Sequence, residues 1–354
     1  MPGYLQVAMR LRQQMKRGDF GESGKLPTVR QLSTDLNISH GVAQRALQHL
    51  QGQRLVQAKR AVGARVIAND ECASTAFLFG VVQPYASSFS FTIFNRLETA
   101  IESRQNLFVM RSSRNEPGRE KQIIQHLIDN GVNGILLWPV EADDNQEYLR
   151  QAAERVPIVL VDRVLRDLPG PSVVLDYAQL GAEIVDQFRA VGCRNILCLS
   201  DPIDISSYNE LHRSIQRRAE ELGPEVKVRF LDMPMLQLLH RYYDGDDRAI
   251  ELALGPLKNV LREEPVDGIF CPQDDVVYRF LIEPGNLRLL ADARLGTITM
   301  QRDRRRLKQF EALGILAWVG DVGRMIGEGI DILQDMTMSR RPLRRQVRVP
   351  FERA

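Results

Sequence analysis

The stretch "LPTVRQLSTDLNISHGVAQRAL", residues 26–47, holds two short amphipathic helical patterns separated by a break of four residues. Thr28 and Gln31 have the spacing of a capping box, which predicts the start of the first helix. Asn37 suits the left-handed residue of a tight turn, and Ser39 suits the N-cap of the second helix. Two helices joined by so short a break predict a helix-turn-helix.

The second of these helices, expected from residue 39 to residue 51, combines an apolar stripe with a polar outer face. The stripe is expected to contain Val42, Ala46 and Leu50, with Ala43 and Leu47 beside it. The residues left to face outward are His40, Gly41, Gln44, Arg45 and Gln48. A helix that enters a DNA groove needs such a face, while the preceding helix holds its inner side. The pattern alone also allows a solvated face on a protein-binding three-helix module.

The flanking residues extend this motif into a small domain. Apolar residues recur upstream at helical spacing, at Leu5, Ala8, Leu11 and Met15, and Gly18 follows as a stop. Downstream, extended runs at 55–58 and 64–68 surround a basic tip with Lys59 and Arg60, which predicts a β-hairpin. Three helices and a two-stranded wing make a winged helix-turn-helix over residues 1–70, whose basic tip can neutralise phosphates.

Residues 4–67 resemble the DNA-binding domain of the GntR family. The resemblance rests on "KLPTVRQLSTDLNIS" (25–39), on Ser39, Ala46, Leu47 and Leu50, and on the wing "LVQAKRAVGARV" (55–66). It implies that Arg30, Arg45 and the wing around Gly63 contact DNA. His40 and Gln44 stand where the family commonly has arginines, which implies a different operator. The candidate DNA-binding residues are Arg30, Ser39, His40, Gln44, Arg45, Lys59, Arg60 and Gly63.

Charge is distributed unevenly along the 354 residues. Residues 1–70 hold 11 Lys and Arg against 4 Asp and Glu, whereas the remainder holds 36 against 41. A basic head on an acidic body predicts that the head meets a polyanion and the body does not. The length favours two or three domains, and 44% hydrophobic with 26% charged residues is typical of a soluble globular protein.

Neither a membrane span nor a metal site is expected. No window approaches about 18 uncharged apolar residues, and the charged N-terminus is not a secretory signal, so we expect a cytoplasmic protein. The cysteines Cys72, Cys193, Cys198 and Cys271 are scattered and have no histidine at ligand spacing. They are interpreted as small core residues of a reduced protein.

From residue 76 onward, short apolar runs alternate with helical patterns. The expected strands are at 76–83, 106–112, 134–140, 157–163, 172–177, 194–201, 227–233 and 267–272. Continuous apolar strands with helices between them predict parallel sheets covered on both faces, and their number predicts two α/β lobes with a ligand cleft between them. After a linker at 71–76, residues 77–354 would form this domain, with crossovers near 163–170, 290–296 and 318–322.

This body resembles the periplasmic-binding-protein-like sensor domain of the LacI/GalR family. The resemblance rests on residues 79–105, 127–139, 156–163, 173–196, 266–277 and 318–354. A GntR-type head on a LacI-type sensor is the layout of arabinose-repressor-type regulators. The resemblance implies a sugar or sugar derivative as effector, contacted by Tyr85, Ser87, Phe89, Trp138, Arg163, His212, Arg213, Asp275 and Asp303.

The chain departs from the sensor family in two places, and several candidates have structural alternatives. His212 stands in register where the family has an arginine, with Arg213 next, and "TMQRDR" (299–304) replaces a Gly-x-Asp motif. Phe89 and Trp138 could belong to the lobe cores. The Asp274–Asp275 pair could cap a helix, and Arg163 could pair with a neighbouring carboxylate.

The sequence favours a regulator over an enzyme. It contains no G-x-x-x-x-G-K-[ST], G-x-G-x-x-G, G-x-S-x-G or H-E-x-x-H motif, and no lysine beyond residue 70 lies in a motif for a Schiff base. We expect no cofactor and no metal. The expected function is a homodimeric transcription repressor on a near-palindromic operator, controlled by a carbohydrate effector. The alternative is a ligand-free dimerisation module controlled by a protein partner.

Overall fold

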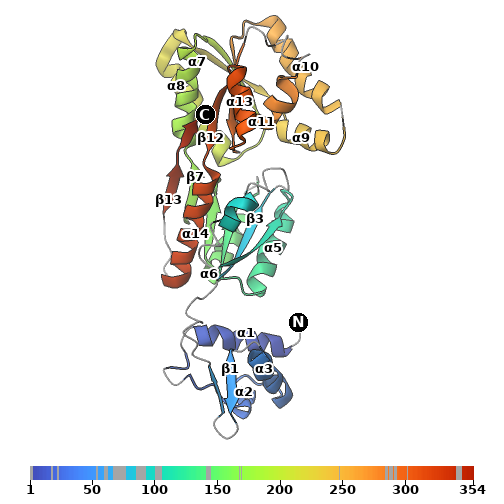
Figure 1. Cartoon of the computed structure of the whole chain (residues 1–354), viewed down its shortest axis with the longest axis vertical. Helices are drawn as coiled ribbons and strands as arrows, with labels where there is room; N and C mark the ends of the chain where they lie inside the picture. Colours follow the sequence, from blue (N-terminus) through green and yellow to red (C-terminus); the bar gives the residue numbers. More distant parts are fainter. Residues whose placement is uncertain are drawn as a thin grey trace. The chain divides into compact units, whose positions relative to one another are not determined.

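The computed structural model describes residues 3–16, 19–21, 24–52, 55–59, 63–66, 77–84, 93–99, 106–140, 145–166, 168, 170–246, 248–283, 286, 290, 293–300, 302–339 and 345–354. The chain divides into two compact units, Met1–Ala76 and Phe77–Ala354. Figure 1 shows the helices and strands of both units. The boundary expected at residue 70 and the linker expected at 71–76 lie outside the described residues.

The N-terminal unit is a winged helix-turn-helix, as predicted. Its elements are α1 (Gly3–Lys16), α2 (Val29–Asp35), α3 (His40–Gly52), β1 (Val56–Lys59) and β2 (Gly63–Val66). The two strands pair antiparallel, with Lys59 opposite Gly63 at the tip. Ala43, Ala46 and Leu50 are almost fully buried in the core of this unit, whereas Val42 and Leu47 are only partly buried at its border. Ala46 and Leu50 of the expected stripe are thus confirmed, and Ala43 takes the place expected for Val42.

Side chains fix the ends of the two central helices. The Thr28 hydroxyl accepts a hydrogen bond from the Gln31 backbone N–H at 3.2 Å, and the Gln31 side chain accepts one from the Thr28 N–H at 2.8 Å. Asn37 adopts a φ of 49°, so it is the left-handed turn residue. The Ser39 hydroxyl accepts from the Val42 N–H at 3.3 Å. The capping box, the turn residue and the serine cap are all confirmed: the first sets where α2 begins, and the other two set where α3 begins.

The C-terminal unit contains two six-stranded sheets. Lobe 1 has the order β13-β7-β6-β5-β3-β4 and is parallel throughout; its strands are β3 (Leu78–Gln83), β4 (Leu107–Ser112), β5 (Gly134–Leu137), β6 (Ile158–Val161), β7 (Ser172–Leu175) and β13 (Gln346–Val349). Lobe 2 has the order β14-β12-β11-β10-β8-β9, with only β14 antiparallel; its strands are β8 (Asn195–Ser200), β9 (Lys227–Asp232), β10 (Gly268–Cys271), β11 (Arg294–Thr299), β12 (Leu316–Gly320) and β14 (Phe351–Arg353).

Helices cover these sheets (Figure 1). Lobe 1 carries α5 (Pro117–Asp129), α6 (Gln146–Arg155), α14 (Val322–Ser339) and a helical segment at 93–99. Lobe 2 carries α7 (Tyr177–Ala190), α8 (Ser206–Leu222), η3 (Gly223–Glu225), α9 (Met235–Tyr243), α10 (Arg248–Glu263), α11 (Asp274–Val276), η4 (Val277–Leu281) and α13 (Arg304–Ala312). Successive strand residues enter different clusters: Cys198 packs in the cluster with α7, and Leu199 in the cluster with α9. Both faces of each sheet are therefore buried, which confirms the predicted fold class.

The passages between the lobes differ from two of the three expected ones. Strand β7 pairs with β6 of the same sheet, so the chain does not cross at 163–170. Strand β11 pairs with β10, so it does not cross at 290–296 either. The chain passes from β7 to α7, from β12 to α14 near the expected 318–322, and from β13 to β14. An apolar run predicts a strand but not its neighbour, because pairing depends on contacts distant in sequence.

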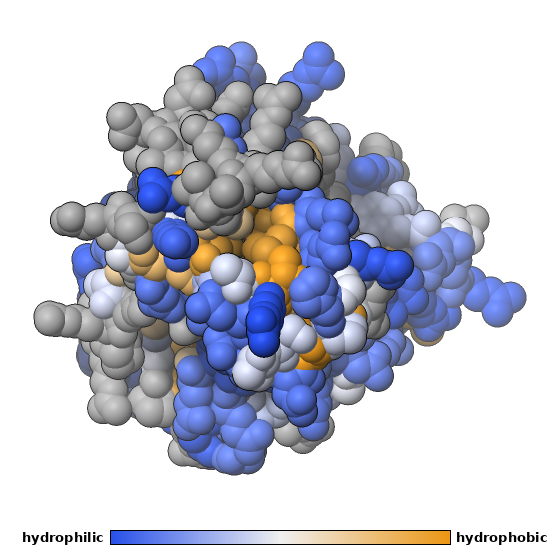
Figure 2. Space-filling view, turned by 90° about the horizontal axis from the view of Figure 1, so that it is seen from below, coloured by the Kyte–Doolittle hydropathy of each residue, from blue (hydrophilic) through white to orange (hydrophobic). Residues whose placement is uncertain are grey.

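Few of the large apolar side chains that the structure describes are exposed. Figure 2 shows a mostly hydrophilic face with a limited apolar area near its centre. Exposed apolar residues in lobe 1 include Phe94, Leu107 and Val109, and the last two lie on β4 at the edge of the sheet. Among the described residues, no helix is both long and apolar enough to span a membrane.

Candidate functional site

The first candidate site is the outer face of α3. His40, Gln44 and Arg45 are exposed on this helix, and Arg30 is exposed on α2. None of these four side chains forms a hydrogen bond or ion pair with another residue that the structure describes. Because they are solvated in this structure, they can engage a ligand without breaking an internal contact. Ser39 has a different position, since its hydroxyl caps α3.

The wing places its backbone beside these helices. Leu26 N–H donates to the Ala64 carbonyl at 2.9 Å, which ties the segment before α2 to the hairpin. Gly63 begins β2 opposite Lys59. The side chain of Lys59 and the whole of Arg60 lie outside the described residues, so their predicted DNA contacts stay predictions.

The second candidate site is a cavity of about 240 Å³ between the two lobes of the C-terminal unit. Lobe 1 contributes Val140, which lies in the loop after β5, and the segment after β6 with Arg163, Val164, Leu165 and Arg166. Lobe 2 contributes the start of α8 and the loop before it, namely Asp204, Ile205, Ser206, Asn209 and Arg213. The lobe 1 residues follow the carboxyl ends of parallel strands, the place where such sheets bind ligands.

The backbone at Asp162 aims Arg163 at this cavity. Asp162 has a φ of 62°, an uncommon left-handed conformation directly after β6. Arg163 is only 6% exposed, and its Nη1 donates to the Pro139 carbonyl at 2.9 Å. Its Nε is buried and has no hydrogen-bond partner among the described residues. A buried guanidinium with an unused donor is unfavourable unless a ligand or water completes it.

Two buried carboxylates lie behind Arg163. Asp162 accepts hydrogen bonds from the Trp138 indole N–H at 3.2 Å and the Tyr177 hydroxyl at 2.9 Å. Glu120 accepts from the Val140 N–H at 2.8 Å and from Asn145 Nδ2 at 3.0 Å. Burial raises the pKa of both carboxyl groups, and the nearby Arg163 charge opposes this rise. These hydrogen bonds fix the floor beneath the cavity.

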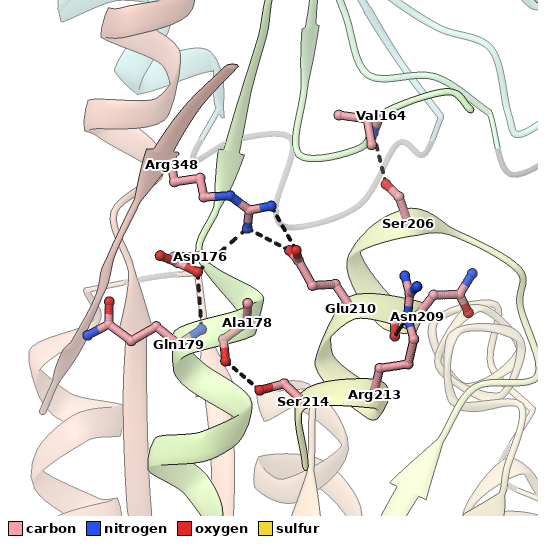
Figure 3. A network of polar contacts seen from close by, with 10 residues as sticks. All are labelled: Val164, Asp176, Ala178, Gln179, Ser206, Asn209, Glu210, Arg213, Ser214 and Arg348. Carbon is pink, nitrogen blue, oxygen red and sulfur yellow. Dashed lines mark hydrogen bonds and ion pairs between the residues drawn. The ribbon is translucent and has the colours of Figure 1, made fainter. Parts of the chain in front are cut away.

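Polar contacts connect the lobes beside the cavity (Figure 3). The Val164 N–H of lobe 1 donates to the Ser206 hydroxyl of α8 at 2.8 Å. Arg348 of β13 donates to both carboxylate oxygens of Glu210 on α8, at 2.8 and 2.9 Å, and lies 3.6 Å from Asp176. These contacts stabilise one arrangement of the lobes. A ligand in the cavity would contact both lobes and so change the stability of the same arrangement.

The structure brings two of the predicted effector residues together at this cavity. Arg163 and Arg213 both line it, from opposite lobes. Arg166, Asp204 and Asn209 also line it but were not predicted. They lie in a loop and on the first turn of α8, where neither periodicity nor a quoted family segment singles them out. Tyr85, Ser87 and Phe89 lie outside the described residues.

Four other predicted effector residues do not line this cavity. Trp138 is buried against Asp162. His212 lies 3.2 Å from the Ser200 hydroxyl and packs on Phe230. Asp275 pairs with Arg306 of α13 at 3.0 Å, and the Asp303 carboxylate caps α13. Internal partners hold these four side chains in this structure, and their predicted contacts with an effector stay predictions. The described residues contain no cluster of three or more potential metal ligands.

Comparison with known proteins gives both units a family context. Residues 3–66 match the family model "Bacterial regulatory proteins, gntR family". The chain is 29% identical over 145 residues to the HTH-type transcriptional regulator PtxS of Pseudomonas plecoglossicida, covering 40% of this chain and 42% of the relative. It is 21% identical over 231 residues to the arabinose metabolism transcriptional repressor of Geobacillus stearothermophilus, covering 63% of each. The matches span about half the length of these curated relatives.

Solved structures share the fold of the C-terminal unit. A LacI transcriptional regulator from Lactobacillus brevis matches with a TM-score of 0.62 and 16% identity, over 78% of this chain and 100% of that one. The Cra transcriptional dual regulator of Pseudomonas putida, solved with fructose 1-phosphate, matches with a TM-score of 0.64 and 16% identity, over 78% and 97%. The chain therefore carries a GntR-type helix-turn-helix domain followed by a domain with the fold of LacI-type sensors.

Proposed function

We propose that the protein is a transcription repressor whose DNA affinity is controlled by a small carbohydrate or carbohydrate derivative. The observation that carries this proposal is the combination in one chain of an exposed polar face on α3 and an arginine-lined cavity between two lobes. Such a polar face, held from behind by α2, fits the geometry of a recognition helix in a major groove. The relatives named above are transcription regulators.

Control by the effector follows from the position of the cavity. A ligand that touches Arg163 of lobe 1 and Arg213 of lobe 2 binds best at one angle between the lobes. It can change DNA affinity only through a difference in its affinity for the two lobe arrangements. As a homodimer, the protein would transmit this change as the spacing of two heads on a near-palindromic operator.

The exposed edge of lobe 1 supports the homodimer. Leu107 is 63% exposed and Val109 is 40% exposed on the edge strand β4, and Phe94 is 42% exposed on the helical segment at 93–99. An apolar edge strand of this kind favours association with a second copy. We further propose a cytoplasmic protein without catalytic activity, cofactor or metal, since none of these is needed for the regulation described.

The proposal is tested by selection from a random pool of double-stranded DNA with the full-length protein. We expect enrichment of one sequence made of two inverted half-sites, because the duplex must match a two-fold symmetric dimer. The variant Arg45→Ala serves as the matched control and should enrich it more weakly. A pool that stays random with the wild type contradicts the DNA-binding function.

A further inference from the structure

The chemistry of the cavity wall carries a more specific assignment of the effector. Resting on the function proposed above, we infer that the effector carries an anionic group, a carboxylate or a phosphate, on a molecule of monosaccharide size. The volume of about 240 Å³ lies just below the usual range of about 300–1,000 Å³ for ligand pockets, which favours a small ligand.

The charges that line the cavity are predominantly positive. Arg163, Arg166 and Arg213 line it, against the single carboxylate of Asp204. Asp204 accepts a hydrogen bond from Asn209 Nδ2 at 2.6 Å, so part of its acceptor capacity is occupied. Neither Arg166 nor Arg213 pairs with a carboxylate anywhere in the part of the chain that the structure describes. Two guanidinium groups at one opening, with no carboxylate partner among the described residues, attract an anion.

Arg163 provides the built part of the site. Arg163 is only 6% exposed and lines the cavity. Its Nε has no hydrogen-bond partner among the described residues. Glu120 and Asp162 lie behind it, but neither lines the cavity and both already accept two hydrogen bonds. The guanidinium itself is held by its hydrogen bond to the Pro139 carbonyl, and its Nε stays available to a ligand.

The remaining lining residues indicate the chemistry of the rest of the effector. Val140, Leu165 and Ile205 offer apolar contact, and Ser206 and Asn209 offer hydrogen bonds suited to hydroxyl groups. Arg213 uses its Nε on the Asn209 carbonyl at 2.9 Å, as Figure 3 shows, which leaves its terminal nitrogens available. A carboxylate or phosphate held between Arg213 and the lobe 1 arginines would accept hydrogen bonds from planar guanidinium groups of both lobes.

The test measures binding of matched ligand pairs to the full-length protein by calorimetry. The panel contains aldonic, uronic and keto sugar acids and sugar monophosphates, each beside its neutral parent sugar. We expect at least one anionic member to bind at least about 10-fold more tightly than its parent, since a hydrogen bond to a charged group corresponds to roughly that factor. Binding confined to the acids assigns a carboxylate, and binding confined to the phosphates assigns a phosphate.

Two variants connect this preference to the cavity. Arg166→Gln and Arg213→Gln remove exposed guanidinium groups, and each should weaken the anionic ligand about 10-fold without affecting the parent sugar. Arg217→Gln is the control, because Arg217 is also exposed on α8 but does not line the cavity. Arg163→Gln is less suitable alone, since its loss would leave two buried carboxylates behind it.

Three results would overturn the anionic assignment. They are a neutral sugar that binds as tightly as its anionic counterpart, an unchanged affinity in both Arg166→Gln and Arg213→Gln, and no binding of any acid or phosphate at millimolar concentration. DNA binding, measured on the same samples with the selected duplex, separates the two claims. A protein that binds the duplex but prefers neutral sugars keeps its proposed function, whereas one that binds no duplex loses it.

Discussion

Removing the Arg45 side chain tests the α3 face most quantitatively. Arg45 is exposed and unpaired within the described residues, so Arg45→Ala should leave the fold intact and remove only an external contact. Each phosphate contact contributes a slope of about −0.9 to the plot of log affinity against log salt concentration. A homodimer contains two copies of Arg45, so the slope should become shallower by about 1.8.

This change in slope has a measurable size. Between about 50 and about 200 mM salt, the wild type should lose about 12-fold more affinity than Arg45→Ala, or about 3.5-fold more for each half-site. The assay is fluorescence anisotropy with the selected duplex over a salt series. Arg12→Ala is the charge-matched control, because Arg12 is exposed on α1, which packs behind α3. An unchanged slope in Arg45→Ala would refute a phosphate contact by Arg45.

Three further variants test local features of the fold and assembly. Thr28→Ala should lower the free energy of unfolding of the N-terminal unit by about 1 kcal/mol in urea denaturation, since it removes half of the capping box. Thr34→Ala is the control near the C-terminal end of the same helix, and the same loss there would argue against the cap. Leu107→Glu should shift the protein from dimer to monomer in analytical ultracentrifugation, and an unaltered dimer would exclude the β4 edge from the interface. Burial raises the pKa of Glu120 above 4.5, so wild-type stability should fall as the pH rises above that value, because the folded state then binds more protons than the unfolded state. Glu120→Gln removes this ionisable group and should show a smaller fall, with the remainder due to buried carboxyl groups such as Asp162. Parallel pH profiles of unfolding for the two proteins would contradict the assignment.

The N-terminal unit could be predicted almost completely from the sequence. The signals at Thr28, Asn37 and Ser39 are local, because a cap or a left-handed turn depends on residues three or four positions apart. Only the buried stripe of α3 differed, since Ala43 rather than Val42 faces the core. Because small and apolar residues lie side by side on this helix, the sequence alone does not decide which of them face the core.

The lobes could be predicted as a class but not in their connections. The apolar runs located the strands at 78–83 and 195–200 to within two residues. The sheet order depends on pairings such as β13 with β7, which join residues about 174 positions apart, as Gln346 and Ser172 show. No local pattern carries that information, and two expected crossovers were therefore wrong.

The cavity shows the same division between local and distant information. Arg163 and Arg213 were expected from the resemblance to the sensor family, and both line the cavity. The ion pair of Asp275 could not be predicted, because its partner Arg306 comes from α13. Arg166 was missed because its loop has no periodicity to read.

The central claim is that occupancy of the lobe cavity controls the DNA affinity of the α3 face. The most direct measurement is the dissociation constant of the full-length protein for its selected duplex, with and without a saturating amount of the anionic ligand found by calorimetry. The account predicts a change of about 5- to 150-fold, and in Arg213→Gln the same change should require about 10-fold more ligand. Equal dissociation constants in the two conditions would show that the two sites are not coupled and would contradict the account.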